Sequence, residues 1–201
     1  MPKRLMVIQG HPDAQSARLC HALAEYYIKG ARSVGSEIRQ FDVGQMDFPL
    51  LRTKAEFDLG RSGTPKSLLP AQDALLWAEH LMIIYPLWHG TMPALLKGFI
   101  EQVFRPDVVE KPVERGFPKK MLLGKSARVV VTMGMPVWAY RWYFGAHSLK
   151  SLKRNILKFS GINPVRSTLF GMVENVSQEK RQGWLTEMEE AGKRDVRIKR
   201  G

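Results

Sequence analysis

Five short segments of the chain have the residue pattern of β-strands. Three of them are nearly continuous apolar runs, a pattern typical of strands that are buried on both faces of a sheet. The second segment along the chain is weak and polar, which suits an edge strand, and the last is short and half polar. The predicted strands cover residues 5–9, 37–43, 80–84, 127–131 and 165–170.

Segments with helical periodicity separate these strands. Ser16 is a suitable N-cap for the first helix, whose apolar spacing predicts an inner face made of Leu19, Leu23, Tyr26 and Tyr27. The predicted helices cover residues 16–31, 71–78, 93–104 and 148–159, and a final helix begins near Ser177. Alternating strands and helices predict an α/β protein whose parallel sheet is covered by helices on both faces. Five strands fit the flavodoxin-like order 2-1-3-4-5.

Two stretches do not follow this alternation. Residues 44–70 are rich in glycine and proline, and an irregular segment of that length in a compact domain is usually functional. Residues 105–124 contain Pro106, Pro112, Gly116 and Pro118 and are predicted to form an excursion from the domain rather than a linker. We therefore expect one flavodoxin-like domain over residues 1–201, with a basic tail at about 192–201.

The loop after the third strand is the most informative part of the sequence. The apolar run 80–84 leads into Pro86, Leu87, Trp88, His89 and Gly90. Pro93 then suits the first position of a helix, where its missing amide hydrogen has no partner to lose. A loop between a buried strand and a helix lies at the carboxyl end of the strand, where open α/β sheets bind ligands.

The loop after the first strand, residues 10–16, leads directly into a helix. The free amides and positive dipole end of a helix N-terminus suit a phosphate group, and Arg18 adds positive charge. An ordinary loop capped by Ser16 explains the same residues, so both interpretations remain open. A Rossmann dinucleotide site needs three glycines, and this loop has only Gly10. The chain contains no P-loop motif.

Charge narrows the choice of partners. The chain carries a formal net charge of +12, which favours anionic partners such as nucleic acids, phosphorylated cofactors or membrane surfaces. Residues 141–166 hold six basic residues and no acidic residue. Nucleic-acid binding is not expected, because no known recognition module surrounds these charges.

Location and redox state follow from simple counts. The single cysteine, Cys20, cannot form an internal disulfide, and no apolar run approaches the length of a membrane span. The apolar stretch at the amino end is too short for a signal peptide. We therefore expect a soluble cytoplasmic protein.

Three motifs together resemble the NAD(P)H quinone reductase family of flavodoxin-like flavoproteins. The first is His11 followed by Ser16 at the start of a helix. The second joins PLWH at 86–89 to MPALLKGF at 92–99, and the third is KSARVVVTMG at 125–134. The resemblance extends from Lys3 to about Glu190. The chain departs from the family pattern at Met135, where a second glycine is common, and at 107–109, which lacks an aromatic residue.

The resemblance implies a site for flavin. The phosphate is expected on the first loop, the flavin ring over the loop after the third strand, and its pyrimidine edge against the loop after the fourth. The implied cofactor-binding residues are His11, Ser16, Ala17, Arg18, Pro86, Leu87, Trp88, His89, Gly90, Thr132, Met133, Gly134 and Met135. Tyr140 and His147 are the implied catalytic residues, although His147 lies one residue later than the family pattern.

The resemblance also implies an activity. The expected protein is a homodimeric oxidoreductase that binds FMN or FAD, takes a hydride from NAD(P)H and reduces a quinone-like acceptor by a ping-pong cycle. An alternative is a non-enzymatic flavin-binding partner that docks peripherally on a membrane transport system. A one-electron flavodoxin carrier is disfavoured, because flavodoxins are usually acidic.

Several residues have simpler interpretations. His21 is expected on the surface, His80 in a structural role and Cys20 as a small buried residue. The cluster Trp142, Tyr143 and Phe144 is expected at a dimer interface, over the flavin or in the core. No histidine or cysteine pair has the spacing of metal ligands, so no metal site is expected.

Overall fold

A five-stranded parallel sheet forms the centre of the protein. The computed structural model describes residues 2–15, 18–111, 113, 116 and 118–197. The strands run in the order β2-β1-β3-β6-β7, which confirms the predicted flavodoxin-like order. Their bounds are β1 Leu5–Gln9, β2 Ile38–Asp42, β3 His80–Pro86, β6 Ser126–Thr132 and β7 Val165–Phe170. Every residue of β1, β3 and β6 is buried, whereas the edge strand β2 is partly exposed, as its polar sequence predicts.

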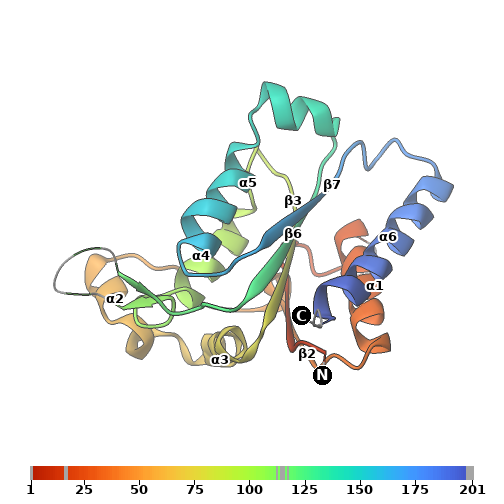
Figure 1. The fold of residues 1–201 in the computed structure, drawn as a ribbon. Coiled ribbons are helices and arrows are strands. Elements are labelled where there is room, and N and C mark those ends of the chain that lie inside the picture. The colour runs from red at the N-terminus through yellow and green to blue at the C-terminus, as the bar shows by residue number, and fades with distance from the viewer. Residues whose placement is uncertain (1, 16–17, 112, 114–115, 117, 198–201) are drawn as a thin grey trace.

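Helices cover both faces of this sheet (Figure 1). On one face lie α1 and α6; on the other lie α3, α4 and α5, with α2 farther out in the irregular segment 44–70. The helix bounds are α1 Leu19–Ser33, α2 Lys54–Asp58, α3 Leu69–Trp77, α4 Ala94–Val103, α5 His147–Ser151 and α6 Gln178–Val196. Successive residues of a strand point to opposite faces, so each central strand supplies both cores.

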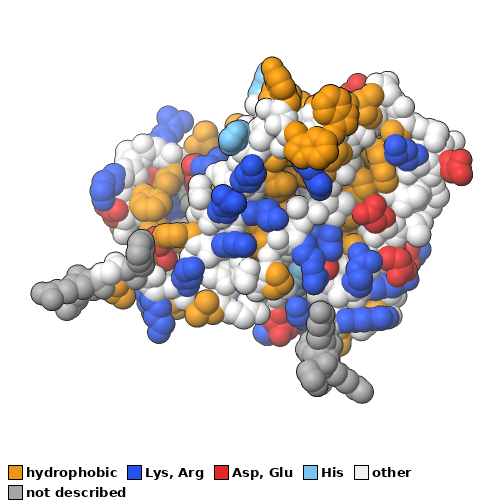
Figure 2. All heavy atoms as spheres, turned by 45° about the horizontal axis from the view of Figure 1, so that its top comes forward, with side chains coloured by type: hydrophobic (Ala, Val, Ile, Leu, Met, Phe, Trp, Pro, Cys, Tyr) orange, Lys and Arg blue, Asp and Glu red, His pale blue; other side chains and the backbone are white. Residues whose placement is uncertain are grey.

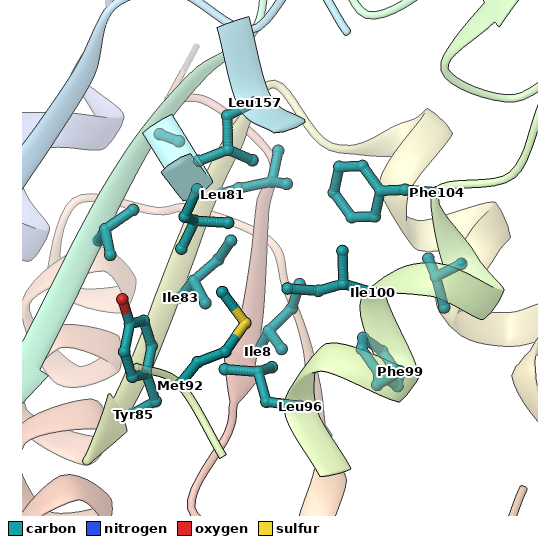
Figure 3. Packing of buried hydrophobic residues seen from close by; sticks show 14 of the residues in the cluster. Ile8, Leu81, Ile83, Tyr85, Met92, Leu96, Phe99, Ile100, Phe104 and Leu157 are labelled. Atoms are coloured by element: carbon teal, nitrogen blue, oxygen red, sulfur yellow. The ribbon is translucent and has the colours of Figure 1, made fainter. Parts of the chain in front are cut away.

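The core beneath α4 is closely packed (Figure 3). Leu96 and Ile100 of α4 point toward Ile8 of β1 and Ile83 of β3, and Phe99 belongs to the same buried cluster. All five side chains are at most 2% exposed. This packing fixes the amino end of α4 relative to the carboxyl end of β3, and so holds the loop between them in place.

Some helix boundaries in the structure differ from the predicted ones. The helix predicted to start at Pro93 begins at Ala94, because Pro93 has an extended ψ of 144° and serves as the N-cap. The first helix begins at Leu19 after Arg18, and Ser16, its predicted N-cap, lies outside the described residues. The helix predicted over 148–159 becomes α5 followed by a π-helical segment, Leu152–Lys158.

The excursion predicted over residues 105–124 contains a hairpin of β4 Glu110–Lys111 and β5 Lys119–Lys120. No helix in the described ranges is long and apolar enough to span a bilayer.

A buried polar network joins the amino ends of β3 and β6 to α1 and α6. The Asp195 carboxylate accepts hydrogen bonds from Tyr27 Oη at 3.0 Å and from Arg128 Nε at 2.5 Å. Tyr27 Oη lies 3.0 Å from Nε2 of His80, whose Nδ1 lies 2.7 Å from Ser126 Oγ. Since the Tyr27 proton goes to Asp195, His80 donates from Nε2 and accepts at Nδ1. The expected structural role of His80 is thus consistent with its position.

This network predicts acid sensitivity. Burial is the main cause that lowers the pKa of His80 from 6.5 to about 3 in the folded protein. Between these pH values the unfolded chain binds one more proton than the folded chain, so the free energy of unfolding falls as the pH falls. The expected loss is about 1.4 kcal/mol per pH unit, and chemical denaturation from pH 6.5 to 4 measures it. His80→Gln is expected to flatten this slope and the exposed His147→Gln to leave it unchanged; equal slopes in all three proteins would contradict the assignment.

Candidate functional site

A cavity of about 630 Å³ opens where the loops after β1, β3 and β6 meet. This volume lies within the usual range for small-molecule sites. The lining residues are His11, Asp13, Arg18, Leu19, Cys20, Pro86, Leu87, Trp88, Thr132, Met133, Gly134, Val173, Glu174 and Arg181. The expectation that the carboxyl ends of the strands form the site agrees with this position.

The first loop is held in shape by its own hydrogen bonds. The amide of His11 donates to Gln9 Oε1 at 3.0 Å, and the amide of Gln15 donates to Asp13 Oδ1 at 2.9 Å. The guanidinium of Arg18 donates to the other oxygen of the Asp13 carboxylate at 2.6 Å. The hydrogen bond from Gln15, followed by that from Arg18, lowers the pKa of Asp13. Asp13 is therefore ionised near neutral pH and orients Arg18 at the mouth of the cavity.

Glycine is required beneath this loop. A Cβ atom on Gly44 would lie 2.7 Å from the carbonyl oxygen of Pro12 and 2.8 Å from that of His11. Backbone atoms cannot shift without a large energetic cost, so any larger residue at this position would push the first loop away from the segment beneath it. Part of the long irregular segment thus has a defined role: it supports the site.

Two histidines lie close together in this loop region. His11 is 9% exposed, and burial is the main cause that lowers its pKa below 6.5. His21 is 7% exposed, with Nε2 3.0 Å from the carbonyl oxygen of Asp13 and Nδ1 3.7 Å from the Asp42 carboxylate. The expectation that His21 is a surface residue is therefore wrong. Because α1 begins at Leu19, His21 falls in its first turn and faces the end of β2.

The second loop makes a tight turn. The amide and carbonyl groups of Trp88 and Thr91 exchange hydrogen bonds of 2.9 Å, and His89 and Gly90 between them both have positive φ, 47° and 78°. Left-handed backbone at both central positions is typical of a type I′ turn. Leu87 donates its amide to the Thr132 carbonyl at 2.7 Å, which ties this loop to the end of β6.

Trp88 separates two cavities. Its indole is 47% exposed and meets the His11 ring edge-on at 5.9 Å. Beyond it lies an adjoining cavity of about 470 Å³ between this loop, the start of α4 and α5. His89 and Ser148 line that second cavity rather than the first.

The third loop supplies a wall with little side-chain bulk. Gly134 is exposed, and a Cβ atom on it would meet nothing within 4 Å. The buried Thr132 hydroxyl lies 3.2 Å from the Cys20 sulfur. Burial raises the pKa of Cys20 to about 12, so its thiol stays neutral and is not a nucleophile. The expectation that Cys20 is a small buried residue agrees with its 2% exposure.

The structure brings most of the predicted binding residues together. Those that line the main cavity are His11, Arg18, Pro86, Leu87, Trp88, Thr132, Met133 and Gly134. Gly90 and Met135 do not line it, and Ser16 and Ala17 lie outside the described residues. The sequence did not identify Arg181, which reaches the cavity from α6, because no local motif links that helix to the loops.

The two predicted catalytic residues lie outside the main cavity. The Tyr140 ring is 1% exposed, and its hydroxyl lies 2.8 Å from Ser148 Oγ and accepts the Leu149 amide at 3.3 Å. His147 is exposed at the start of α5. Tyr140 therefore reaches the second cavity only through Ser148. Their catalytic roles stay predictions.

The chemistry of the main cavity is that of a binding site. Arg18 and Arg181 stand at its wall with Asp13 and Glu174, while Leu87, Met133 and Val173 are among its apolar residues. The described residues contain no group of three or more potential metal ligands. Such a cavity suits a small organic molecule that has both polar and apolar parts.

Comparisons with known proteins agree with this geometry. Residues 3–191 match the model of a family described as having a flavodoxin-like fold. The chain is 31% identical over 179 residues to an FMN-dependent NADH:quinone oxidoreductase of Hahella chejuensis, with 81% of each chain covered. It is 24% identical to an uncharacterized NAD(P)H oxidoreductase of Haemophilus influenzae, covering 90% of this chain and 89% of that one.

A solved structure agrees as well. The crystal structure of Smu.1420 from Streptococcus mutans superposes with a TM-score of 0.81 at 27% identity, covering 95% of this chain and 99% of the other. The chain belongs to the NAD(P)H quinone reductase family of flavodoxin-like proteins, as its motifs predict. Membership in this family makes the protein an oxidoreductase.

Proposed function

We propose that the protein uses FMN to oxidise NAD(P)H and to reduce a quinone-like acceptor by a ping-pong cycle. The observation that carries the proposal is the cavity formed by three carboxyl-end loops, with arginine at its mouth and a bare glycine in its wall. The Hahella relative, named as FMN-dependent, and the family membership support the choice of cofactor.

The first loop suits the phosphate of FMN. Arg18 is already oriented by Asp13 at 2.6 Å, and α1 begins at the next residue, Leu19. The amides of a helix N-terminus and a fixed guanidinium are both favourable partners for a phosphate. His11 sits beside them and is neutral at pH 7 in the free protein, because burial lowers its pKa. A bound phosphate would favour the protonated form of His11.

The second and third loops suit the flavin ring. Leu87 and Thr132 hold these loops together through their backbone bond, so the slot between them is preformed. Gly134 leaves room at its edge, and Trp88 offers an aromatic surface beside it. Backbone amides in a preformed slot can stabilise negative charge on a ring edge without reorganising.

A bound FMN would supply the two-electron hydride chemistry between NAD(P)H and the acceptor. The protein then needs only to bind and orient the cofactor and its substrates and to shield them from water. No protein nucleophile is needed, which is consistent with the neutral thiol of Cys20. We place the acceptor beside Trp88, where the two cavities meet. Ser148 lies in that second cavity within hydrogen-bond distance of the Tyr140 hydroxyl. This pair is our candidate for proton donation to a quinone oxygen, with His147 as the second candidate.

Steady-state kinetics test the proposed cycle. Initial rates of NAD(P)H oxidation, measured at several fixed concentrations of a soluble benzoquinone, are expected to give parallel double-reciprocal lines. Intersecting lines would show that both substrates bind together and would exclude the ping-pong cycle.

Arg18→Gln is expected to weaken FMN binding about tenfold, because a charge-assisted hydrogen bond to phosphate is lost. Riboflavin, which has the same ring and no phosphate, is expected to bind the variant and the parent protein equally. Fluorescence titration measures both affinities. Arg32→Gln, an exposed change in the last turn of α1, is the matched control. If riboflavin and FMN weakened equally, Arg18 would serve only to shape the loop.

The homodimer, the single domain and the cytoplasmic location stay predictions.

A further inference from the structure

An aromatic surface projects beyond the end of β6. It consists of Trp138, Trp142, Tyr143 and Phe144, and these residues are 62%, 81%, 81% and 50% exposed. Figure 2 shows hydrophobic side chains gathered at the upper edge of the molecule. The alternative that this cluster fills the core is therefore wrong. Large apolar side chains exposed side by side mark interaction sites.

Hydrogen bonds of Tyr140 and a tight backbone turn hold this surface in place. Tyr140, at 1% exposure, anchors the segment through its hydrogen bonds to Ser148 and Leu149 of α5. Two successive residues with positive φ, Gly145 at 61° and Ala146 at 48°, then turn the chain back into α5. The aromatic rings thus stand on a fixed support rather than on a loose loop.

A group of cations lies next to this surface. Arg141, Lys150, Lys153, Arg154 and Lys158 line a hollow of about 320 Å³ beside α5 and β7, and we call them the cationic cluster. None of them forms an ion pair with a carboxylate in the part of the chain that the structure describes.

Cations without a carboxylate partner also occur elsewhere among the described residues, Lys66 and Lys119 for example, but here five of them line one hollow. Elsewhere on the surface, Lys29, Lys54 and Lys97 each pair with a carboxylate. Burial and the neighbouring positive charges together lower the pKa of Lys153. Figure 2 shows blue side chains gathered directly below the orange ones. The cluster thus presents uncompensated positive charge beside exposed aromatic rings.

We propose that the aromatic surface and the cationic cluster together bind the surface of a bilayer containing anionic lipids. Tryptophan and tyrosine favour the level of the lipid headgroups, because their rings are apolar and carry a polar atom. Lysine and arginine near an anionic membrane each add favourable electrostatic energy that acts within a Debye length. The two groups adjoin on one side of the molecule, so both can reach the same plane.

Two other partners fit less well. Single-stranded nucleic acids bind where aromatic rings alternate with cations along a groove, whereas here the rings form one group and the cations another. A second copy of the chain would have to place carboxylates opposite the cationic cluster, and residues 141–166, which carry the cluster and three of the four rings, contain no acidic residue. Both remain outcomes of the test.

Bilayer binding has a consequence for the site that rests on the proposed function. Trp138 is only four residues beyond Gly134, which lines the main cavity. A protein bound through the aromatic surface would hold that cavity near the bilayer, where apolar quinones dissolve. Binding itself needs neither flavin nor activity, so its failure would leave the proposed function untouched.

Flotation with protein-free vesicles tests the proposal. The full chain is expected to bind vesicles of phosphatidylglycerol and phosphatidylcholine at least about tenfold more tightly than vesicles of phosphatidylcholine alone. In about 1 M salt, where the Debye length is about 3 Å, that preference is expected to disappear. Equal binding to both vesicles, or binding to neither, would overturn the proposal.

Two variants assign the binding to this surface. Lys150, Lys153 and Lys158 changed together to Gln are expected to weaken binding on the order of 100-fold, and Trp142→Ser with Tyr143→Ser about tenfold. The matched control changes Lys29, Lys54 and Lys66 to Gln, which removes the same charge from other surfaces and is expected to have little effect. Circular dichroism confirms that each variant is folded. Equal loss in the control would mean that only net charge matters, and would overturn the assignment.

Two further measurements distinguish lipid binding from binding to nucleic acid or to a second copy of the chain. A single-stranded oligonucleotide that binds more tightly than the anionic vesicles, and loses affinity in the same variants, would replace the lipid with nucleic acid. Sedimentation without vesicles would overturn the proposal if Trp142→Ser with Tyr143→Ser turned a dimer into monomers, because the aromatic surface would then be an interface between subunits.

Discussion

Replacing Gly134 with tryptophan is expected to weaken FMN binding on the order of 100-fold, equivalent to about 3 kcal/mol, while the protein remains folded. Gly134 lines the main cavity, and the space around its missing Cβ is open to at least 4 Å. An indole there would enter the slot proposed for the flavin ring, and the Cβ atom that carries it would meet no protein atom within 4 Å. Fluorescence titration with FMN measures the change, and thermal unfolding of the flavin-free protein shows whether the fold is kept.

The matched control for this change is Gly183→Trp. Gly183 is exposed on α6, and a Cβ atom on it also meets nothing within 4 Å. Both variants add the same side chain at an open glycine, but only one adds it at the cavity. FMN affinity that stayed unchanged in Gly134→Trp would mean that the ring binds elsewhere, and equal losses in both variants would point to an indirect effect.

Asp195→Ala is expected to lower the free energy of unfolding by about 3–5 kcal/mol, the usual cost of removing one partner of a buried ion pair. Asp195 is 2% exposed, and its carboxylate accepts hydrogen bonds from Tyr27, Arg128 and Arg166. Removing it leaves the guanidinium of Arg128, itself 7% exposed, without its main partner. Chemical denaturation at neutral pH measures the loss.

Asp73→Ala provides the comparison. Asp73 pairs with Arg61 at 2.7 Å, but about half of each side chain is exposed. Exposed pairs contribute little, about 0–1 kcal/mol. A loss in Asp195→Ala no larger than that in Asp73→Ala would show that the buried network does not stabilise the fold.

The sheet could be predicted from the sequence because its central strands are buried on both faces. Continuous apolar runs mark β3 and β6 without any knowledge of their neighbours, and the polar composition of β2 marks it as an edge. The helix boundaries were less certain. Pro93 illustrates the reason: the same proline fits a first helical residue or an N-cap, and its ψ of 144° decides for the N-cap.

The site could be predicted only where a motif carried it. The loops after β1, β3 and β6 are continuous in sequence, so their residues were found together. Arg181 comes from α6, and only the folded chain brings it to the cavity. His21 has the spacing of a surface residue, and its burial depends on Asp13 and Asp42 from two other segments. Contacts between distant segments of this kind have no local signal.

The central claim is that the main cavity holds one FMN that NAD(P)H reduces and a quinone reoxidises. An anaerobic absorbance titration tests it most directly. Purified protein incubated with FMN and freed of excess is expected to retain one flavin per chain, to lose its visible absorbance on addition of one equivalent of NAD(P)H, and to regain it on addition of a benzoquinone. Protein that retains no flavin, or whose bound flavin is unchanged by NAD(P)H, would contradict the account.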